Sequence, residues 1–371
     1  MQKSRLRKGL SKGVALAAVL VVIAGLIAAA AGCGGDEQAG GGGLAVPSAQ
    51  LTGAGATFPY PIYSKWFDEF GKQYPQVNIN YQSVGSGAGI QQIIAQTVDF
   101  GASDAAMSDA DLAKAPAELL HVPTVAGAVV VTYNVEGVQG GLKLTPENLA
   151  GIFLGKITRW NDPALKADNP GVNFPDEDIV TVHRSDGSGT TNIFTSYLDT
   201  VSPDWHAQVG KGKEVKWPVG LGGKGNEGVS GQVSQTKGAI GYVELAYAKQ
   251  NKLSYAWMKN KAGNFVEPTL DSTKAAVQSA VVNLPADLRI SLGNPDGKDA
   301  YPIAGFTYIL VYKDQKDQAK GQALVSFLWW AIHDGSQYTA ALDYVSQPPE
   351  MVKKVENQIR KINYKGQSLA P

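Results

Sequence analysis

Residues 179–198, IVTVHRSDGSGTTNIFTSYL, decide the fold. The first residues predict a short strand, and DGSGTT predicts a loop rich in glycine and hydroxyl side chains. Beyond the loop, Ile193, Phe194, Tyr197 and Leu198 lie at helical spacing. A strand, a polar loop and a helix in this order are typical of α/β proteins, whose ligands bind at the carboxyl ends of the strands.

The same pattern recurs elsewhere in the chain. TGAGATFPYP follows Leu51, a GSGAG loop spans residues 85–89, and a weaker case, GLGGKGNEG, precedes Val229. The first N–H groups of a helix lack intrahelical partners and lie at the positive end of its dipole. Glycines let a ligand approach the backbone, and Ser and Thr add donors. One such loop can simply cap a helix, but several in one chain favour a shared anion site.

The N-terminus predicts export. Basic residues are followed by an apolar run, Val14–Ala31, and then by Gly32-Cys33. Small residues before cysteine resemble a bacterial lipobox, so we predict a lipoprotein signal peptide over residues 1–32, with Cys33 as the lipid attachment site. Residues 33–50 then form a Gly-rich tether. The alternative is an uncleaved transmembrane anchor. In both cases the body lies outside the cytoplasm, at the outer face of the membrane or in the periplasm.

Composition narrows the possible partners. The 371 residues suffice for two lobes, and 33 basic residues balance 33 acidic ones. A formal net charge of zero argues against nucleic acid and against binding to an anionic membrane surface, which both usually select a basic excess. One cysteine and four scattered histidines do not form a metal-binding pattern. We therefore expect no metal and no cofactor.

Two other functions compete with anion binding. Residues 220–225 satisfy the dinucleotide pattern G-x-G-x-x-G, and Glu244 follows at a suitable distance, but Trp217-Pro218 interrupts the strand that should precede them. An exported hydrolase could use Ser188 as its nucleophile with His183 nearby, or else Asp104. However, the G-x-S-x-G arrangement of such nucleophiles is absent from this segment.

Longer motifs identify a family. LTGAGATFPYPIYSKWF, QTVDFGASDAAMSD, RSDGSGTTNIFTSYL, KWPVGLGGKGNEG and GAIGYVELAYAKQN resemble the phosphate-binding protein of the bacterial phosphate-specific ABC importer, the PstS family. The likeness runs from about Leu51 almost to the C-terminus. It implies a two-lobed periplasmic-binding-protein fold, type II-like, with two crossover strands and a ligand cleft between the lobes. Matched residue by residue, the phosphate contacts of the family fall on Thr57, Phe58, Ser86, Asp104, Arg184, Ser188, Gly189 and Thr190.

The residue types suit these roles. Phe58 and Gly189 can offer only backbone N–H groups, whereas the Ser and Thr residues also supply hydroxyls. Arg184 is the lone strong cation and suits a two-pronged grip on oxyanion oxygens. Asp186 could brace that guanidinium by ion pairing, or could instead cap the following helix.

Asp104 is unexpected because a carboxylate repels an anion. By itself it would be read as an exposed loop residue. The family resemblance implies that it faces the ligand, where a proton on phosphate can donate to it. Sulfate has no such proton, so we expect Asp104 to select phosphate over sulfate. Binding of another tetrahedral oxyanion such as sulfate is the remaining alternative.

The resemblance also predicts the domain layout and the partners. Lobe one should contain residues 51–130 and 305–371, and lobe two residues 131–304. VVVTYN (129–134) and GFTYIL (305–310) are the predicted crossover strands. The expected partners are inorganic phosphate and the membrane subunits of an ABC permease, with the binding protein itself a monomer that performs no chemistry.

Overall fold

A mixed sheet centred on one long strand organises the fold. The computed structural model describes residues 46–281 and 284–371, and within them nine strands form this sheet. Its central strand, β4 (Leu119–Asn134), pairs along residues 119–128 with one neighbour and along residues 129–134 with another. The sheet therefore has two parts that meet within β4.

The first half-sheet comprises residues 119–128 of β4 and four further strands. In spatial order these are β2 (Val77–Ser83), β1 (Ala49–Gly55), β3 (Phe100–Ser103) and β12 (Ala304–Tyr312). β1 is parallel to both of its neighbours, whereas β12 runs antiparallel to β3 and β4. The carboxyl ends of β1, β2 and β3 therefore lie at one edge, where the loops that follow them come together.

The second half-sheet comprises residues 129–134 of β4 and three further strands. In spatial order these are β8 (Ala239–Glu244), β6 (Val180–Arg184) and β7 (Leu221–Gly223). β8 is antiparallel to β4, and β6 is parallel to both β8 and β7. A short strand, β9 (Ser254–Tyr255), also pairs with β4.

Two small sheets and the helices complete the described residues. The small sheets are β11 (Phe265–Val266), β10 (Trp257–Lys259) and β5 (Lys143–Leu144), and the pair β13 (Asn363–Tyr364) and β14 (Gln367–Ser368). The helices are α1 (Tyr60–Gln73), α2 (Ser86–Ile94), α3 (Asp109–Leu112), α4 (Pro146–Phe153), α5 (Pro163–Asp168), α6 (Gly189–Val201), α7 (Pro203–Gln208), α8 (Gly225–Gln235), α9 (Leu245–Gln250), α10 (Leu270–Val281), α11 (Gln318–Ile332) and α12 (Pro349–Ile359), with 3-10 turns η1 (Asp334–Tyr338) and η2 (Ala340–Leu342).

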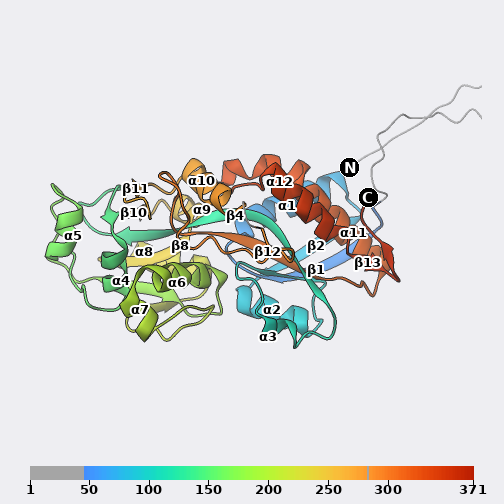
Figure 1. Cartoon of the computed structure of the whole chain (residues 1–371), viewed down its shortest axis with the longest axis horizontal. Coiled ribbons are helices and arrows are strands. Elements are labelled where there is room, and N and C mark those ends of the chain that lie inside the picture. The colour runs from blue at the N-terminus through green and yellow to red at the C-terminus, as the bar shows by residue number, and fades with distance from the viewer. Residues whose placement is uncertain (1–45, 282–283) are drawn as a thin grey trace, which may run out of the picture. The chain divides into compact units, whose positions relative to one another are not determined.

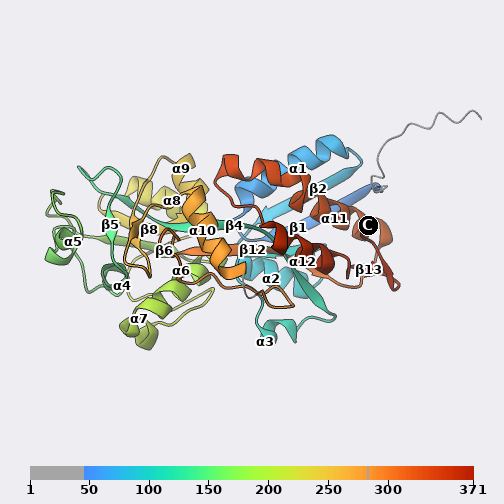
Figure 2. The same cartoon turned by 45° about the horizontal axis from the view of Figure 1, so that its top comes forward.

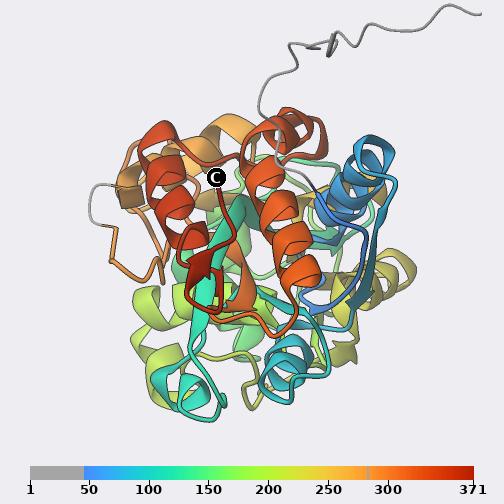
Figure 3. The same ribbon diagram turned by 90° about the vertical axis from the view of Figure 1, so that its right-hand side faces the viewer.

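Helices cover both faces of the first half-sheet. α1, α11 and α12 lie on one face and α2 lies on the other (Figures 1 and 3). α10 packs against β4 and β12, close to the point where the two half-sheets meet (Figure 2). Because both faces are covered, β4 is a nearly continuous apolar run whose residues 119–133 are all buried.

The predicted strand, loop and helix units are present. The segment 179–198 folds as β6, a loop and α6, and the GSGAG loop leads from β2 into α2. β1 begins at Ala49, two residues before the position at which we place the start of the body, because Ala49 pairs with Val77 and is buried. VVVTYN forms the second part of β4, and GFTYIL lies in β12.

Some predictions fall outside the described residues. These are the signal peptide, Cys33 and the tether as far as residue 45. None of the described helices is long and apolar enough to cross a bilayer. The lobe boundaries at residues 130 and 304 stay predictions.

Candidate functional site

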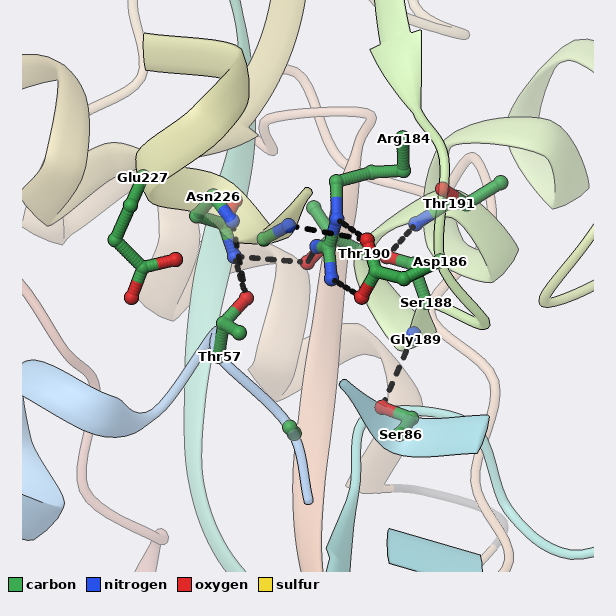
Figure 4. Close-up of polar contacts among 12 residues, drawn as sticks. Thr57, Ser86, Arg184, Asp186, Ser188, Gly189, Thr190, Thr191, Asn226 and Glu227 are labelled. Carbon is green, nitrogen blue, oxygen red and sulfur yellow. Dashed lines mark hydrogen bonds and ion pairs between the residues drawn. The ribbon is translucent and has the colours of Figure 1, made fainter. Parts of the chain in front are cut away.

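Loops from both half-sheets meet at one buried place. The Ser86 hydroxyl oxygen, at the start of α2, accepts a hydrogen bond from the N–H of Gly189, the first residue of α6, at 3.0 Å. The side-chain N–H of Asn226, in the first turn of α8, donates to the Thr57 hydroxyl oxygen at 2.7 Å. Figure 4 shows these contacts side by side. The first turns of three helices therefore converge with the loop that precedes α1.

The structure brings the predicted contact residues together. A chain of hydrogen bonds joins Asn226 to Thr57 and Thr190, and Thr190 to Arg184. A second chain joins Gly189, Ser86 and the backbone N–H of Asp104. All eight predicted residues are buried, and they are Thr57, Phe58, Ser86, Asp104, Arg184, Ser188, Gly189 and Thr190.

Three hydroxyls of the site are fixed as donors. Two N–H groups of Asn226 point at Thr57 Oγ1, at 3.1 and 2.7 Å, and the N–H groups of Gly189 and Asp104 point at Ser86 Oγ, at 3.0 and 3.2 Å. A hydroxyl oxygen has two acceptor positions and one hydrogen. With both acceptor positions occupied, these hydroxyls can only donate.

Thr190 Oγ1 is held in the same way. It accepts from Arg184 Nη1 at 3.4 Å and from Asn226 Nδ2 at 3.2 Å. The hydrogens of Thr57 and Thr190 therefore remain available to an acceptor-rich ligand, whereas that of Ser86 is directed at Asp104 Oδ2 at 3.5 Å.

Arg184 is clamped by Asp186. The guanidinium donates twice, through Nε to Oδ1 at 2.8 Å and through Nη2 to Oδ2 at 2.6 Å, and only 1% of the Arg184 side chain is exposed. The N–H of Gly225 donates to the same carboxylate at 3.0 Å. Burial by itself would raise the pKa of Asp186, but the bonds and charge of Arg184 lower it overall. The ion pair we expected from the sequence is present, while the N-cap of α6 is Ser188, whose hydroxyl accepts from Thr191 N–H.

Asp104 is buried rather than exposed. Thr307, on β12, donates to Oδ1 at 2.8 Å, and the Ser86 hydroxyl lies 3.5 Å from Oδ2. Burial raises the pKa of Asp104 to about 7, although the Thr307 bond and the positive charge of Arg184 oppose the rise. Near neutral pH this carboxyl can therefore gain or lose a proton.

The close approach of the two half-sheets depends on glycine. A Cβ atom at Gly189 would lie 2.6 Å from both Asp104 Cβ and Ser86 Oγ. Nearby, the N–H of Gly87 donates to the carbonyl of Gly187 at 2.7 Å. Backbone from the second half-sheet can therefore touch the start of α2 only because these positions lack side chains.

Asn226 and Thr307 were not identified from the sequence. Asn226 lies in the weaker GLGGKGNEG loop, and its side chain links Thr57 to Thr190. Thr307 is a polar residue in an otherwise apolar strand, GFTYIL, and this is the signal that could have marked it. Its pairing with Asp104 required the register of β12 against β3.

The site does not have the arrangement of the two competing functions. His183 Nδ1 lies 3.0 Å from the backbone carbonyl of Arg184, and its ring stacks on Trp217, so it does not act on the Ser188 hydroxyl. Glu244 is completely buried and caps α9 through Ala246 N–H, so it is not placed to bind a ribose hydroxyl. Among the described residues, no group of three or more His, Cys, Asp or Glu side chains could hold a metal ion.

Sequence comparisons agree with this architecture. Residues 43–334 match the model of the PBP superfamily domain. The phosphate-binding protein PstS of Pasteurella multocida is 47% identical over 316 residues, which cover 85% of this chain and 91% of that protein. The phosphate-binding protein PstS of Methanocaldococcus jannaschii is 38% identical over 331 residues, covering 83% and 85% of the two chains.

Structural comparisons confirm the two-lobed fold. A high-affinity periplasmic phosphate-binding protein, solved with phosphate bound, superposes with a TM-score of 0.66 at 21% identity, covering 83% of this chain and 92% of that one. A phosphate-binding protein from Stenotrophomonas maltophilia superposes with a TM-score of 0.66 at 20% identity, covering 83% and 93%. These solved structures share the predicted fold class with this chain.

Proposed function

The chain belongs to the PstS family within the PBP superfamily, and we propose that it is an extracytoplasmic receptor that binds inorganic phosphate and delivers it to an ABC importer. One observation carries the proposal. The hydroxyls of Thr57, Ser86 and Thr190 are all fixed as donors around a buried Arg184. Such a site suits a small ligand with acceptors on every side, which describes a tetrahedral oxyanion.

Binding relies on positioned dipoles and on one cation. The hydroxyls and the N–H groups at the starts of α2 and α6 offer hydrogen bonds that replace the water around the anion, and the N–H of Gly189 exchanges its bond to Ser86 Oγ for one to the ligand. Arg184 supplies the positive charge, and Asp186 fixes the plane of its guanidinium. The phosphate contacts we propose are Thr57, Phe58, Ser86, Asp104, Arg184, Ser188, Gly189 and Thr190, with Asp186 in support.

The two half-sheets should close around the ligand, because each of them supplies some of the contact residues. Thr57, Ser86 and Asp104 belong to the first half-sheet, and Arg184 and the start of α6 belong to the second. A ligand that touches both sides favours the closed form by its additional contacts. The closed form is what the permease subunits would recognise, and the protein performs no chemical step.

Asp104 supplies selectivity in this proposal. When ionised, it accepts a hydrogen bond from a protonated oxygen of phosphate. Sulfate near neutral pH has no such hydrogen and would leave the buried carboxylate facing a second negative charge. A site built around a required hydrogen bond can reject the analogue that lacks it by about 10⁴- to 10⁵-fold.

Calorimetric titration tests both parts of the proposal. The full chain, kept in detergent because of its apolar N-terminal segment, is stripped of bound ligand by unfolding and refolding and then titrated with phosphate and with sulfate. We expect one-to-one binding of phosphate and no heat from sulfate. In Asp104→Asn, we expect the ratio of sulfate to phosphate dissociation constants to fall by at least about 100-fold.

Each contrary result has a distinct meaning. A folded wild-type chain that binds neither anion would overturn the proposed function. Unchanged rejection of sulfate by Asp104→Asn would remove only the role given to this carboxyl. An assay for phosphate release from a chromogenic ester addresses the hydrolase alternative, and we expect no turnover.

The lipid anchor is a separate part of the proposal. It rests on Cys33 and the preceding small residues. Metabolic labelling with a palmitate analogue should label the wild-type chain and not Cys33→Ser. Equal labelling of both would exclude this cysteine as the attachment site.

A further inference from the structure

Three tyrosine hydroxyls hold three consecutive carbonyl groups beside the site. In the described part of the chain, Tyr81, Tyr247 and Tyr344 donate to the carbonyls of residues 56, 57 and 58 at 2.7, 2.6 and 2.6 Å, respectively. Residues 57 and 58 are two of the proposed phosphate contacts. Because the tyrosines bond to carbonyl groups, they act on the backbone of the loop.

The bond from Tyr247 controls a particular N–H group. The carbonyl of Thr57 and the N–H of Phe58 belong to one planar peptide and point in opposite directions when it is trans. The Thr57 carbonyl also accepts from the N–H of Tyr60 at 3.1 Å, and the shorter bond from Tyr247, at 2.6 Å, adds a second anchor that fixes the direction of the Phe58 N–H. Tyr344 donates to the carbonyl of the peptide group that joins Phe58 to Pro59. Because proline has no N–H, that bond orients no donor and can only anchor the loop.

The three tyrosines come from different parts of the fold. Tyr81 is on β2, and Tyr344 precedes Val345, which bridges to Ala126 of β4, so both belong with the first half-sheet. Tyr247 lies on α9, directly after β8 of the second half-sheet. Of the three tyrosine bonds, only that of Tyr247 spans the two half-sheets, as the bonds from Asn226 to Thr57 Oγ1 also do.

The hydroxyls of Tyr247 and Tyr344 each face a carboxyl group as well as a carbonyl, and each has one hydrogen to donate. Tyr247 lies 2.6 Å from the Thr57 carbonyl and 3.1 Å from Glu227 Oε1, so the shorter contact with the carbonyl takes the hydrogen. Tyr344 likewise lies closer to its carbonyl than to Glu244 Oε2, which is 2.9 Å away. Burial raises the pKa of Glu244 well above its usual range. A protonated Glu244 can then donate to the Tyr344 oxygen and complete that contact.

We propose that Tyr247 is a positioning residue for phosphate: from the second half-sheet it holds the Thr57 carbonyl and aims the Phe58 N–H at the bound anion once the two half-sheets have closed. This inference rests on the proposed function. Its hydroxyl makes no contact with the ligand and acts through the peptide between Thr57 and Phe58. Because the bond joins the two half-sheets, we expect it to form on closure and to slow release of phosphate without changing its capture.

Matched Tyr→Phe variants separate this role from general packing. Tyr247→Phe removes the bond that spans the half-sheets, Tyr81→Phe removes a similar bond within the first half-sheet, and Tyr312→Phe removes a bond to the Ile93 carbonyl, remote from the loop. Stopped-flow measurements on the full chain in detergent give the association and dissociation rate constants for inorganic phosphate. The chemical shift of the ¹⁵N-labelled Phe58 amide, with and without phosphate, reports the direction of its N–H.

The expected results differ among the variants. In Tyr247→Phe the dissociation rate constant should rise about 5- to 10-fold, the loss of one buried hydrogen bond, with the association rate constant unchanged within about two-fold. The phosphate-induced shift of the Phe58 amide should shrink in this variant. In Tyr81→Phe the bond is lost before and after closure, so association should also slow. Tyr312→Phe should match the wild type.

Two outcomes would overturn the inference while the proposed function stands. One is a wild type that binds phosphate and a Tyr247→Phe variant with unchanged rate constants and an unchanged Phe58 shift. The other is a Tyr247→Phe variant whose loss of affinity comes from slower association. A wild-type chain that does not bind phosphate at all would instead overturn the proposed function.

Discussion

The loop after β6 and the loops after β1 and β3 face each other across the site but carry their charges differently. On the β6 side, the positive charge of Arg184 is matched by Asp186, and the N–H of Gly225 holds the carboxylate from a third direction. On the opposite side, Asp104 is held by the hydroxyl of Thr307 and is buried. One side thus carries a buried ion pair, and the other has a carboxyl whose charge can change near neutral pH.

This difference means that one side attracts oxyanions in general and the other side selects phosphate among them. A paired and buried guanidinium offers a directed set of N–H donors but little net charge, so any oxyanion could use it. The buried carboxyl of Asp104 has a pKa raised to about 7. When it is ionised, it accepts a hydrogen bond only from an anion that carries a proton. We therefore assign affinity mainly to the β6 side and selectivity to the β3 side.

Removal of the cation should have the largest effect. In Arg184→Gln, Asp186 remains buried without its partner and faces the bound anion, so both sides of the site would carry negative charge. Loss of one member of a buried charged pair costs about 2–5 kcal/mol. We expect the phosphate dissociation constant to rise by about 10³-fold, measured by calorimetry. A change of less than about tenfold would mean that attraction does not depend on the β6 side.

Separation of the two sides should have the next largest effect. In Gly189→Ala, the new Cβ would lie 2.6 Å from both Asp104 Cβ and Ser86 Oγ, so the start of α6 must move away from α2. Overpacking of this kind costs about 1–3 kcal/mol. We expect phosphate affinity to fall by about 10- to 100-fold while the midpoint of thermal unfolding without phosphate changes little. Gly231→Ala is the control, because a Cβ at Gly231 would meet no atom within 4 Å.

The pH dependence of stability isolates the β3 side and, unlike the two changes above, is measured without phosphate. The pKa of Asp104 is raised by burial from 3.8 to about 7, so the folded chain holds this proton more tightly than the unfolded chain. The stability that this carboxyl contributes is present below about pH 4 and is lost as the pH rises through 7. At about 1.4 kcal/mol for each unit of pKa shift, Asp104→Asn should therefore gain up to about 4 kcal/mol over the wild type between pH 4 and pH 8.

Urea unfolding without phosphate, at pH 4.5, 6 and 8, measures this difference. Lowered pKa values of other carboxylates, such as Asp186, act with the opposite sign in both proteins and cancel in the comparison. If the difference in free energy of unfolding between variant and wild type does not depend on pH, Asp104 is ionised at all three pH values. The charge on the β3 side would then be as constant as that on the β6 side.

Local parts of the site were predictable from the sequence. Arg184 and Asp186 are two residues apart at the end of a strand, so their ion pair depends on one turn of backbone. The strand, loop and helix units around Ser86 and Gly189 were likewise predictable, because hydrophobic periodicity and glycine-rich loops are local signals. The family resemblance supplied the list of predicted contacts, which the structure places within one buried cluster.

Contacts between distant segments were not predictable. Asn226 is 169 residues from Thr57, Thr307 is 203 residues from Asp104, and Tyr247 is 190 residues from the carbonyl that it holds. Thr307 stands out as a polar residue in an apolar strand, but nothing along the chain says which distant segment any of the three residues contacts. Which of them reach the site depends on the pairing of β12 with β3 and on the position of β8 beside β4.

The sequence by itself determined which loops can present N–H groups, hydroxyls and one cation, because helix starts, glycines and neighbouring charges act over a few residues. Only the tertiary structure decided the environment of Asp104, the donor orientation of the hydroxyls and the tyrosines that hold the Thr57 loop. These properties depend on burial and on the partners that other strands bring close. Burial and long-range partners follow from the order and register of the strands, which no single segment encodes.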